Sequence, residues 1–210
     1  MSNSRVLRII GAVAIILSGL INFVSRVVRF LGIFTDVTPG FWAVFSHIIL
    51  PLLLFAACVY FGVILIASDD MMLTFSGVIA VATVEFITFL YACFTDFRFY
   101  WLSILSILIT TIIMLAIILF VMYISFAAFK INVPSGFIRF GFILPTAIMA
   151  LIAVVSFIFN IFWVFVVFPS DVGLILSREI GFYIATFFVD VIFAVAMFTI
   201  GASIADRNDK

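Results

Sequence analysis

The residues most able to do chemistry in this chain are polar side chains set inside long apolar stretches. Glu85 lies within residues 71–94, MMLTFSGVIAVATVEFITFLYACF. A charge that faced lipid at such a depth would cost about 2.5–3.5 kcal/mol, so we expect Glu85 to face protein or water. Five further residues share this situation and complete a candidate polar cluster: Asn22, Arg26, His47, Asn160 and Asp190.

The depths of these side chains predict that they gather in one half of a bilayer. At the helical rise of about 1.5 Å per residue, Glu85 lies ~21 Å from the end of its stretch at Met71. His47 enters from the opposite face and lies ~9 Å deep, which is about the level of Glu85. Asp190 lies ~15 Å from that same face. We therefore expect the cluster in the leaflet away from the two chain termini.

Two interpretations of the cluster follow. In the first, Glu85, His47 and Asp190 line a vestibule in which a carboxylate binds a cation or relays a proton. In the second, Glu85 pairs with Arg26 or His47, and Asp190 bonds to Thr186 one turn back. Such polar contacts hold helices together in lipid at ~0.6–2 kcal/mol each. The second, structural interpretation is the one we favour from sequence.

The composition excludes an ordinary soluble domain. Of 210 residues, 68% are hydrophobic and 10% are charged, whereas soluble domains are about 45–50% apolar and about 25% charged. The chain is therefore expected to be an integral membrane protein whose first partner is the lipid bilayer. The net charge is zero and no dense Lys/Arg cluster occurs, so we expect no nucleic-acid partner.

The apolar stretches predict an all-α, polytopic transmembrane helix bundle. Each stretch holds the ~20 residues that cross the hydrocarbon core, and stretches of this length cross it as helices. The short separators leave no room for a soluble domain, so residues 1–210 are expected to form a single membrane domain of three helical hairpins. The six predicted spans are 8–33, 41–67, 71–94, 100–129, 140–168 and 180–204.

The distribution of Lys and Arg predicts the orientation. The side of the membrane with the termini collects six basic residues and the opposite side collects four. Because basic residues accumulate in cytoplasmic segments, both termini are expected in the cytoplasm. The six are Arg5, Arg8, Lys130, Arg139, Arg207 and Lys210, and the four are Arg26, Arg29, Arg98 and Arg178.

Motifs of enzymes and of metal or cofactor sites do not occur. The chain has one histidine and lacks H-E-x-x-H, G-x-S-x-G and the P-loop, so we expect no enzyme, no metal and no cofactor. Asp69 and Asp70 are adjacent carboxylates without a nearby histidine, and we interpret them as a solvated turn that caps the next helix. Cys58 and Cys93 lie in apolar stretches and are not expected to form a disulfide.

These observations predict a non-enzymatic membrane scaffold or accessory subunit of a membrane complex. It would act through helix–helix contacts with other membrane protein chains or with further copies of itself. The alternative is a small cation- or proton-coupled transporter or channel with a polar vestibule around Glu85, for which a small cation or a proton would be the ligand.

Overall fold

The protein is an all-α bundle in which six helices are long and apolar enough to cross a membrane. The computed structural model describes residues 3–33, 40–95, 100–131, 134–167 and 172–208. This architecture confirms the predicted polytopic helix bundle and identifies an integral, multi-pass membrane protein. The elements are α1 (Asn3–Ile33), α2 (Phe41–Val44), the π-helical turn η1 (Phe45–Ile49), α3 (Leu50–Ala67), α4 (Met71–Thr95), α5 (Tyr100–Ala128), α6 (Ser135–Phe140), α7 (Ile143–Val167) and α8 (Val172–Asn208).

The helix boundaries agree with the predicted spans to within a few residues, except at α8. This helix begins at Val172, eight residues before the predicted span of 180–204, and ends at Asn208, four residues after it. The short α6 precedes the fifth span. Residue 168, which ends the fifth predicted span, lies outside the described residues, as do Arg98 and Lys210 of the orientation count.

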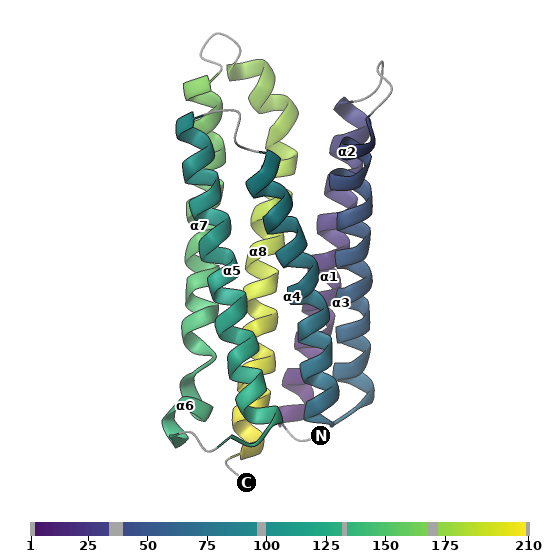
Figure 1. The fold of residues 1–210 in the computed structure, drawn as a ribbon, viewed down its shortest axis with the longest axis vertical. Helices are drawn as coiled ribbons and strands as arrows, with labels where there is room; N and C mark the ends of the chain where they lie inside the picture. The colour runs from purple at the N-terminus through teal and green to yellow at the C-terminus, as the bar shows by residue number, and fades with distance from the viewer. Residues whose placement is uncertain (1–2, 34–39, 96–99, 132–133, 168–171, 209–210) are drawn as a thin grey trace.

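The six spans run along the length of the bundle (Figure 1), and their contacts form a closed ring. Each span packs on the next one along the chain, so the three predicted hairpins are present but are not separate units. The most extensive contact joins the first and last helices, α1 and α8, and closes the ring. The beginning of α1 and the end of α8 lie together at what we call the terminal end, and the opposite end is the far end.

Pro51 explains the irregular start of the second span. A proline lacks the N–H that would bond to the carbonyl four residues earlier, which here belongs to His47. The chain forms the π-helical turn η1 immediately before this point and continues as a regular α-helix from Leu50. Pro145 needs no such adjustment, because it lies in the first turn of α7, where no intrahelical donor is required.

Large buried side chains fill the ring in its terminal half. Ile15, Phe61, Val81, Phe120 and Met197 come from five different helices, and each is at most 3% exposed. They line one small void and therefore lie at about the same level along the bundle. We call these five residues the closed layer.

Below the closed layer, α5 and α8 approach α6 and the turn that follows it very closely. Tyr123 is fully buried, and its hydroxyl lies 2.9 Å from the Ile138 carbonyl oxygen and 3.1 Å from that of Gly201. A Cβ atom added to Gly201 would lie 2.3 Å from Cβ of Phe142, so only glycine permits this packing. The terminal half of the ring is thus densely packed.

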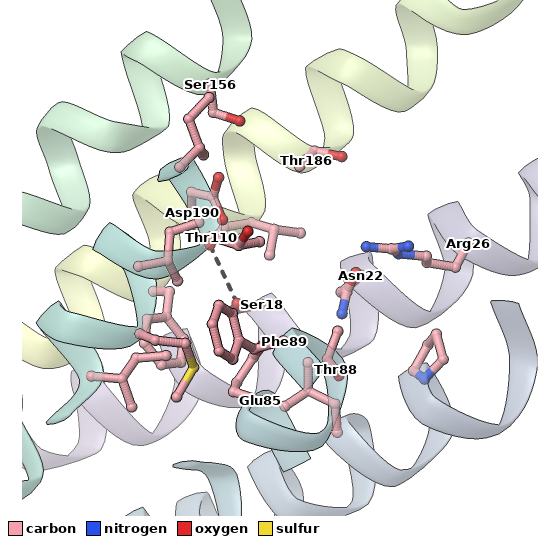
Figure 2. Close-up of a pocket in the computed structure, with 18 of the residues that line it drawn as sticks. Ser18, Asn22, Arg26, Glu85, Thr88, Phe89, Thr110, Ser156, Thr186 and Asp190 are labelled. Atoms are coloured by element: carbon pink, nitrogen blue, oxygen red, sulfur yellow. Dashed lines mark hydrogen bonds between the residues drawn. The ribbon is translucent and has the colours of Figure 1, made fainter. Parts of the chain in front are cut away.

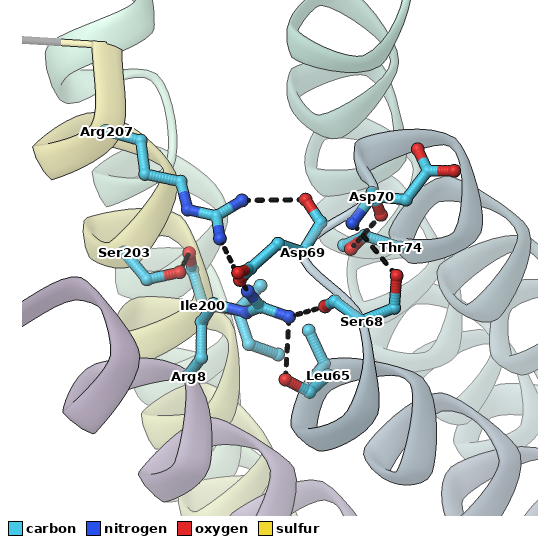
Figure 3. Close-up of polar contacts among 9 residues, drawn as sticks. All are labelled: Arg8, Leu65, Ser68, Asp69, Asp70, Thr74, Ile200, Ser203 and Arg207. Atoms are coloured by element: carbon cyan, nitrogen blue, oxygen red, sulfur yellow. Dashed lines mark hydrogen bonds and ion pairs between the residues drawn. The ribbon is translucent and has the colours of Figure 1, made fainter.

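Three charged residues tie the ring together at the terminal end, and we call them the terminal clasp: Arg8, Asp69 and Arg207 (Figure 3). The Arg8 side chain is 6% exposed and pairs with the Asp69 carboxylate. Its Nη2 atom also donates to the Leu65 carbonyl at 2.7 Å. Arg207 pairs with the same carboxylate and donates from Nη1 to the Asp69 carbonyl at 2.9 Å. The clasp therefore joins α1, the α3–α4 turn and α8.

The sequence-based interpretation of the acidic turn was right for one carboxylate and incomplete for the other. Asp70 caps α4, because its Oδ1 atom accepts a hydrogen bond of 2.8 Å from the Met72 N–H. Asp69 is 80% exposed, as a solvated turn predicts, but it also pairs with two arginines. Desolvation alone would raise the pKa of Asp69. Because the charges of Arg207 and Arg8 together outweigh this effect, the pKa of Asp69 lies below its usual value.

Candidate functional site

A polar cavity of about 230 Å³ lies inside the ring, between the closed layer and the far end (Figure 2). All six spans contribute polar side chains to its wall, so it is a feature of the whole bundle. The polar lining residues are Ser18, Asn22, Arg26, Ser46, Glu85, Thr88, Ser106, Thr110, Ser156, Asn160, Thr186 and Asp190. The structure thus brings together five of the six residues of the candidate polar cluster.

The charged residues of the wall are Glu85 on α4, Asp190 on α8 and Arg26 on α1, and each is half-buried. Among the described residues, neither carboxylate has a hydrogen-bond or ion-pair partner. The Arg26 guanidinium lies 5.7 Å from the centre of the Phe182 ring and pairs with no carboxylate of the described chain. With all three groups ionised, the cavity carries a net charge of −1.

The three charges lie at different depths. Because Ile15, Val81 and Met197 belong to the closed layer, distances along each helix can be counted from them. Glu85 follows Val81 by four residues and lies about 6 Å above that layer, at the helical rise of 1.5 Å per residue. Asp190 precedes Met197 by seven residues, and Arg26 follows Ile15 by eleven, so they lie about 10 Å and about 16 Å above it.

The uncharged polar side chains divide into two groups. Three threonines donate to carbonyls of their own helices, at 3.0 Å for Thr88, 2.7 Å for Thr110 and 2.9 Å for Thr186. This common arrangement satisfies the hydroxyl proton and leaves the oxygen lone pairs available to the cavity. The side chains of Asn22 and Asn160 form no hydrogen bond within the described part of the chain.

His47 is not among the residues that line the cavity. Its Nδ1 atom lies 2.8 Å from Oγ of Ser46 and 3.2 Å from the Ala43 carbonyl oxygen, both on its own helical segment. Its ring packs near Phe30, with 6.0 Å between ring centres. The proposed pairing of this histidine with Glu85 is therefore not formed.

The other pairs of the structural interpretation are not formed either. The Thr186 hydroxyl donates to the Phe182 carbonyl and not to Asp190. Near Arg26 on the same helix, Arg29 does pair with a carboxylate, and its Nε atom lies 2.9 Å from Oε2 of Glu179. This pair links α1 to α8 near the far end. The interhelical pairs predicted from the sequence are thus replaced, in the cavity, by unpaired groups.

The far end of the bundle is less tightly packed than the terminal end. Figure 1 shows the helices close together at the terminal end and spread apart at the other. On α4, no residue from 82 to 94 is buried, whereas Thr74, Val78 and Val81 are. The cavity therefore lies in the looser half of the ring, and dense packing separates it from the terminal end.

The chemistry of this cavity is that of binding polar or charged groups. Unpartnered carboxylate, guanidinium and amide groups at membrane depth require water or a ligand, because burying them without partners costs several kcal/mol. The cavity is large enough for several water molecules. Among the residues that the structure describes, no group of three or more His, Cys, Asp or Glu side chains is placed to hold a metal ion.

Two kinds of site residue were not anticipated from the sequence. The serine and threonine lining residues gave no signal, since such residues occur throughout membrane helices. The pairing of Arg29 with Glu179 joins residues 150 positions apart, and no local pattern marks it.

Comparisons with protein-family models, with curated proteins and with solved structures found no match to this chain.

Proposed function

We propose that this protein is a small cation- or proton-coupled membrane transporter that binds its cation in the central cavity. The observation that carries the proposal is the pair of unpartnered carboxylates, Glu85 and Asp190, on the wall of a cavity with one arginine. With all three groups ionised, the site has one negative charge in excess, and one monovalent cation or one proton neutralises it. Intramembrane carboxylates in such positions commonly mark ion pathways.

The closed layer favours a transporter over an open channel. A channel needs a continuous polar path, whereas Ile15, Phe61 and Met197 interrupt any path toward the terminal end. A cavity that is sealed on one side and approached from the other is the geometry of one state of an alternating-access cycle. We place the entrance at the far end, opposite the two termini, and expect that end to face away from the cytoplasm.

The scaffold prediction receives less support. The contacts among the six spans close a ring within one chain, and the outward-facing apolar side chains are those that lipid requires. No described feature therefore calls for a second protein. The role proposed for the cavity is binding and passage, so it involves no bond-breaking chemistry and we retain the prediction that the chain is not an enzyme.

Electrical recording on a solid-supported membrane tests the proposal directly. Purified protein in liposomes is exposed to sudden jumps in Na⁺, K⁺ or H⁺ concentration, and a cation that enters the cavity produces a transient current. We expect a current with at least one of these ions, its loss in Glu85→Gln, and its retention in Asp70→Asn, which removes an acid outside the cavity. Absence of current with all three ions, or an unchanged current in Glu85→Gln, would contradict the proposal.

A further inference from the structure

The cavity holds charged side chains of both signs, whereas a site for a cation alone requires only the negative ones. Arg26 and Asp190 project into it from α1 and α8 (Figure 2). They form no ion pair with each other, although these two helices make the most extensive contact in the bundle. A cavity that served only a cation would gain nothing from an unpaired guanidinium in its wall, because the two positive charges repel.

We propose that the substrate of this cavity is a small zwitterion that carries both an ammonium and a carboxylate group, as α-amino acids do. This inference rests on the proposed function and names the substrate class of the same site. The substrate carboxylate accepts two parallel hydrogen bonds from the Arg26 guanidinium, an arrangement that the planar fork of arginine favours. The substrate ammonium group donates to Asp190.

The depths of the charges fit this assignment. Arg26 and Asp190 are the two upper groups, about 16 Å and about 10 Å above the closed layer, counted along their helices. Glu85 is the deepest, about 6 Å above it. A zwitterion therefore occupies the upper part of the cavity, and Glu85 remains free for the coupled cation or proton beneath it.

Charge balance supports the same division. With Glu85, Asp190 and Arg26 ionised, the wall carries two negative charges and one positive charge, and a zwitterion adds none. The bound complex is still short of one positive charge, which the coupled cation or proton at Glu85 supplies. The loaded cavity is then neutral, as is favourable for a site inside a membrane, and the expected coupling is one cation or proton per substrate.

The dimensions and the remaining lining residues indicate a small substrate. At about 230 Å³, the cavity is smaller than the roughly 300–1,000 Å³ of pockets for drug-sized ligands. Its apolar wall includes Phe89, Phe159 and Phe193. These rings and the threonine hydroxyls suit a short side chain, either apolar or bearing a hydroxyl group.

The test uses matched sets of ligands that differ only in their charged groups. Alanine is compared with ethylamine and propionate, and serine with ethanolamine and 3-hydroxypropionate. Binding to the full-length protein in lipid nanodiscs is measured by titration calorimetry, in the presence of whichever cation gives a transient current. We expect at least one of the two amino acids to bind at least about tenfold more tightly than either of its single-charge analogues, because each loses a charged hydrogen bond.

Variants of the cavity residues test which side chain binds each charged group of the substrate. Arg26→Gln should weaken amino-acid binding about tenfold or more but should not weaken ethylamine binding, because it removes a positive charge that repels the amine. Arg26→Lys should recover part of the loss. Asp190→Asn should also weaken amino-acid binding, yet keep the cation current that Glu85→Gln abolishes. Arg5→Gln, which removes an exposed arginine outside the cavity, is the control and should change neither.

The outcomes separate this inference from the proposed function. If amines bind as tightly as amino acids, or if a cation current exists and neither amino acid binds, the zwitterion inference is wrong and the cation-binding cavity stands. If no cation current and no binding occur, both are wrong. If Arg26→Gln leaves amino-acid binding intact, the guanidinium is not the carboxylate partner and the inference fails.

Discussion

Replacing Glu85 with glutamine should make the protein more stable and less functional at once. Glu85 has no partner in the described chain, so its charge is a cost to the folded state that the uncharged amide avoids. Placing a carboxylate at the centre of a membrane helix costs about 2.5–3.5 kcal/mol. Since the half-buried Glu85 reaches the water of the cavity, we expect Glu85→Gln to recover only part of this, about 1 kcal/mol.

The assay is thermal denaturation of the purified protein in a buffer whose only cation is bulky, such as N-methylglucamine. For a chain of this length, 1 kcal/mol corresponds to a rise in melting temperature of about 2–4 °C. The matched control is Glu179→Gln, which removes the same charge but takes away the ion-pair partner of Arg29. That variant should lose about 1–2 kcal/mol, because a partly buried guanidinium is left unpaired.

The opposite signs of these two changes make the comparison decisive. Removal of a carboxylate that holds helices together destabilises the bundle, whereas removal of an unpartnered carboxylate that serves binding does not. If Glu85→Gln lowers the melting temperature as much as Glu179→Gln does, Glu85 is a structural residue and the reasoning about the cavity is refuted.

Three further predictions concern the terminal half. Desolvation is the largest single effect on the pKa of Asp69 and raises it, but Arg207 and Arg8 together outweigh it and hold this pKa below its usual value. The clasp therefore stabilises the fold above about pH 4 and loses this contribution as the pH falls through the folded-state pKa. Asp69→Asn should remove that acid-dependent part of stability, which is less than about 1 kcal/mol for so exposed a side chain. The assay is the melting temperature between pH 3 and pH 7, about the range that brackets a carboxyl pKa. A variant whose profile is the same as that of the wild type would contradict this. Tyr123→Phe should cost about 0.6–2 kcal/mol in thermal denaturation, since the carbonyls of Ile138 and Gly201 lose the one hydroxyl donor that they share. A neutral result would mean that these contacts contribute nothing. Gly201→Ala should cost about 1–3 kcal/mol because Phe142 must move, and wild-type stability would show that the turn between α6 and α7 yields easily to α8.

The membrane fold was predictable because hydrocarbon thickness sets the length of an apolar helix. Spans such as 71–94 could therefore be placed from composition and length alone. Closure of the ring through α1 and α8 could not be predicted, because the lipid-facing and protein-facing sides of such helices are equally apolar. The wrong limits of α8 have a related cause, since Arg178 and Glu179 interrupt the apolar stretch without ending the helix.

The site was predictable to the extent that lipid excludes its residues. Glu85, Asp190 and Arg26 had to face the interior because a charge facing lipid is costly, and the structure gathers them in one cavity. His47 escaped this reasoning, since an imidazole can bond to its own helix and pack on an aromatic ring, as it does here. The pairs predicted around Glu85 failed because sequence gives depth along a helix but not direction around it.

The central claim is that the ring encloses a water-filled, negatively charged cavity, and thiol modification tests it most directly. In a chain with Cys58→Ala and Cys93→Ala, a cysteine is introduced by Ser156→Cys in the cavity wall or by Ala153→Cys, whose native alanine is fully buried on the same helix. Cationic and anionic methanethiosulfonate reagents that do not cross membranes are applied to sealed vesicles of known orientation. The account predicts that Ser156→Cys reacts only from the far end and faster with the cationic reagent, while Ala153→Cys does not react. No reaction at Ser156→Cys, or faster reaction with the anionic reagent, would contradict it.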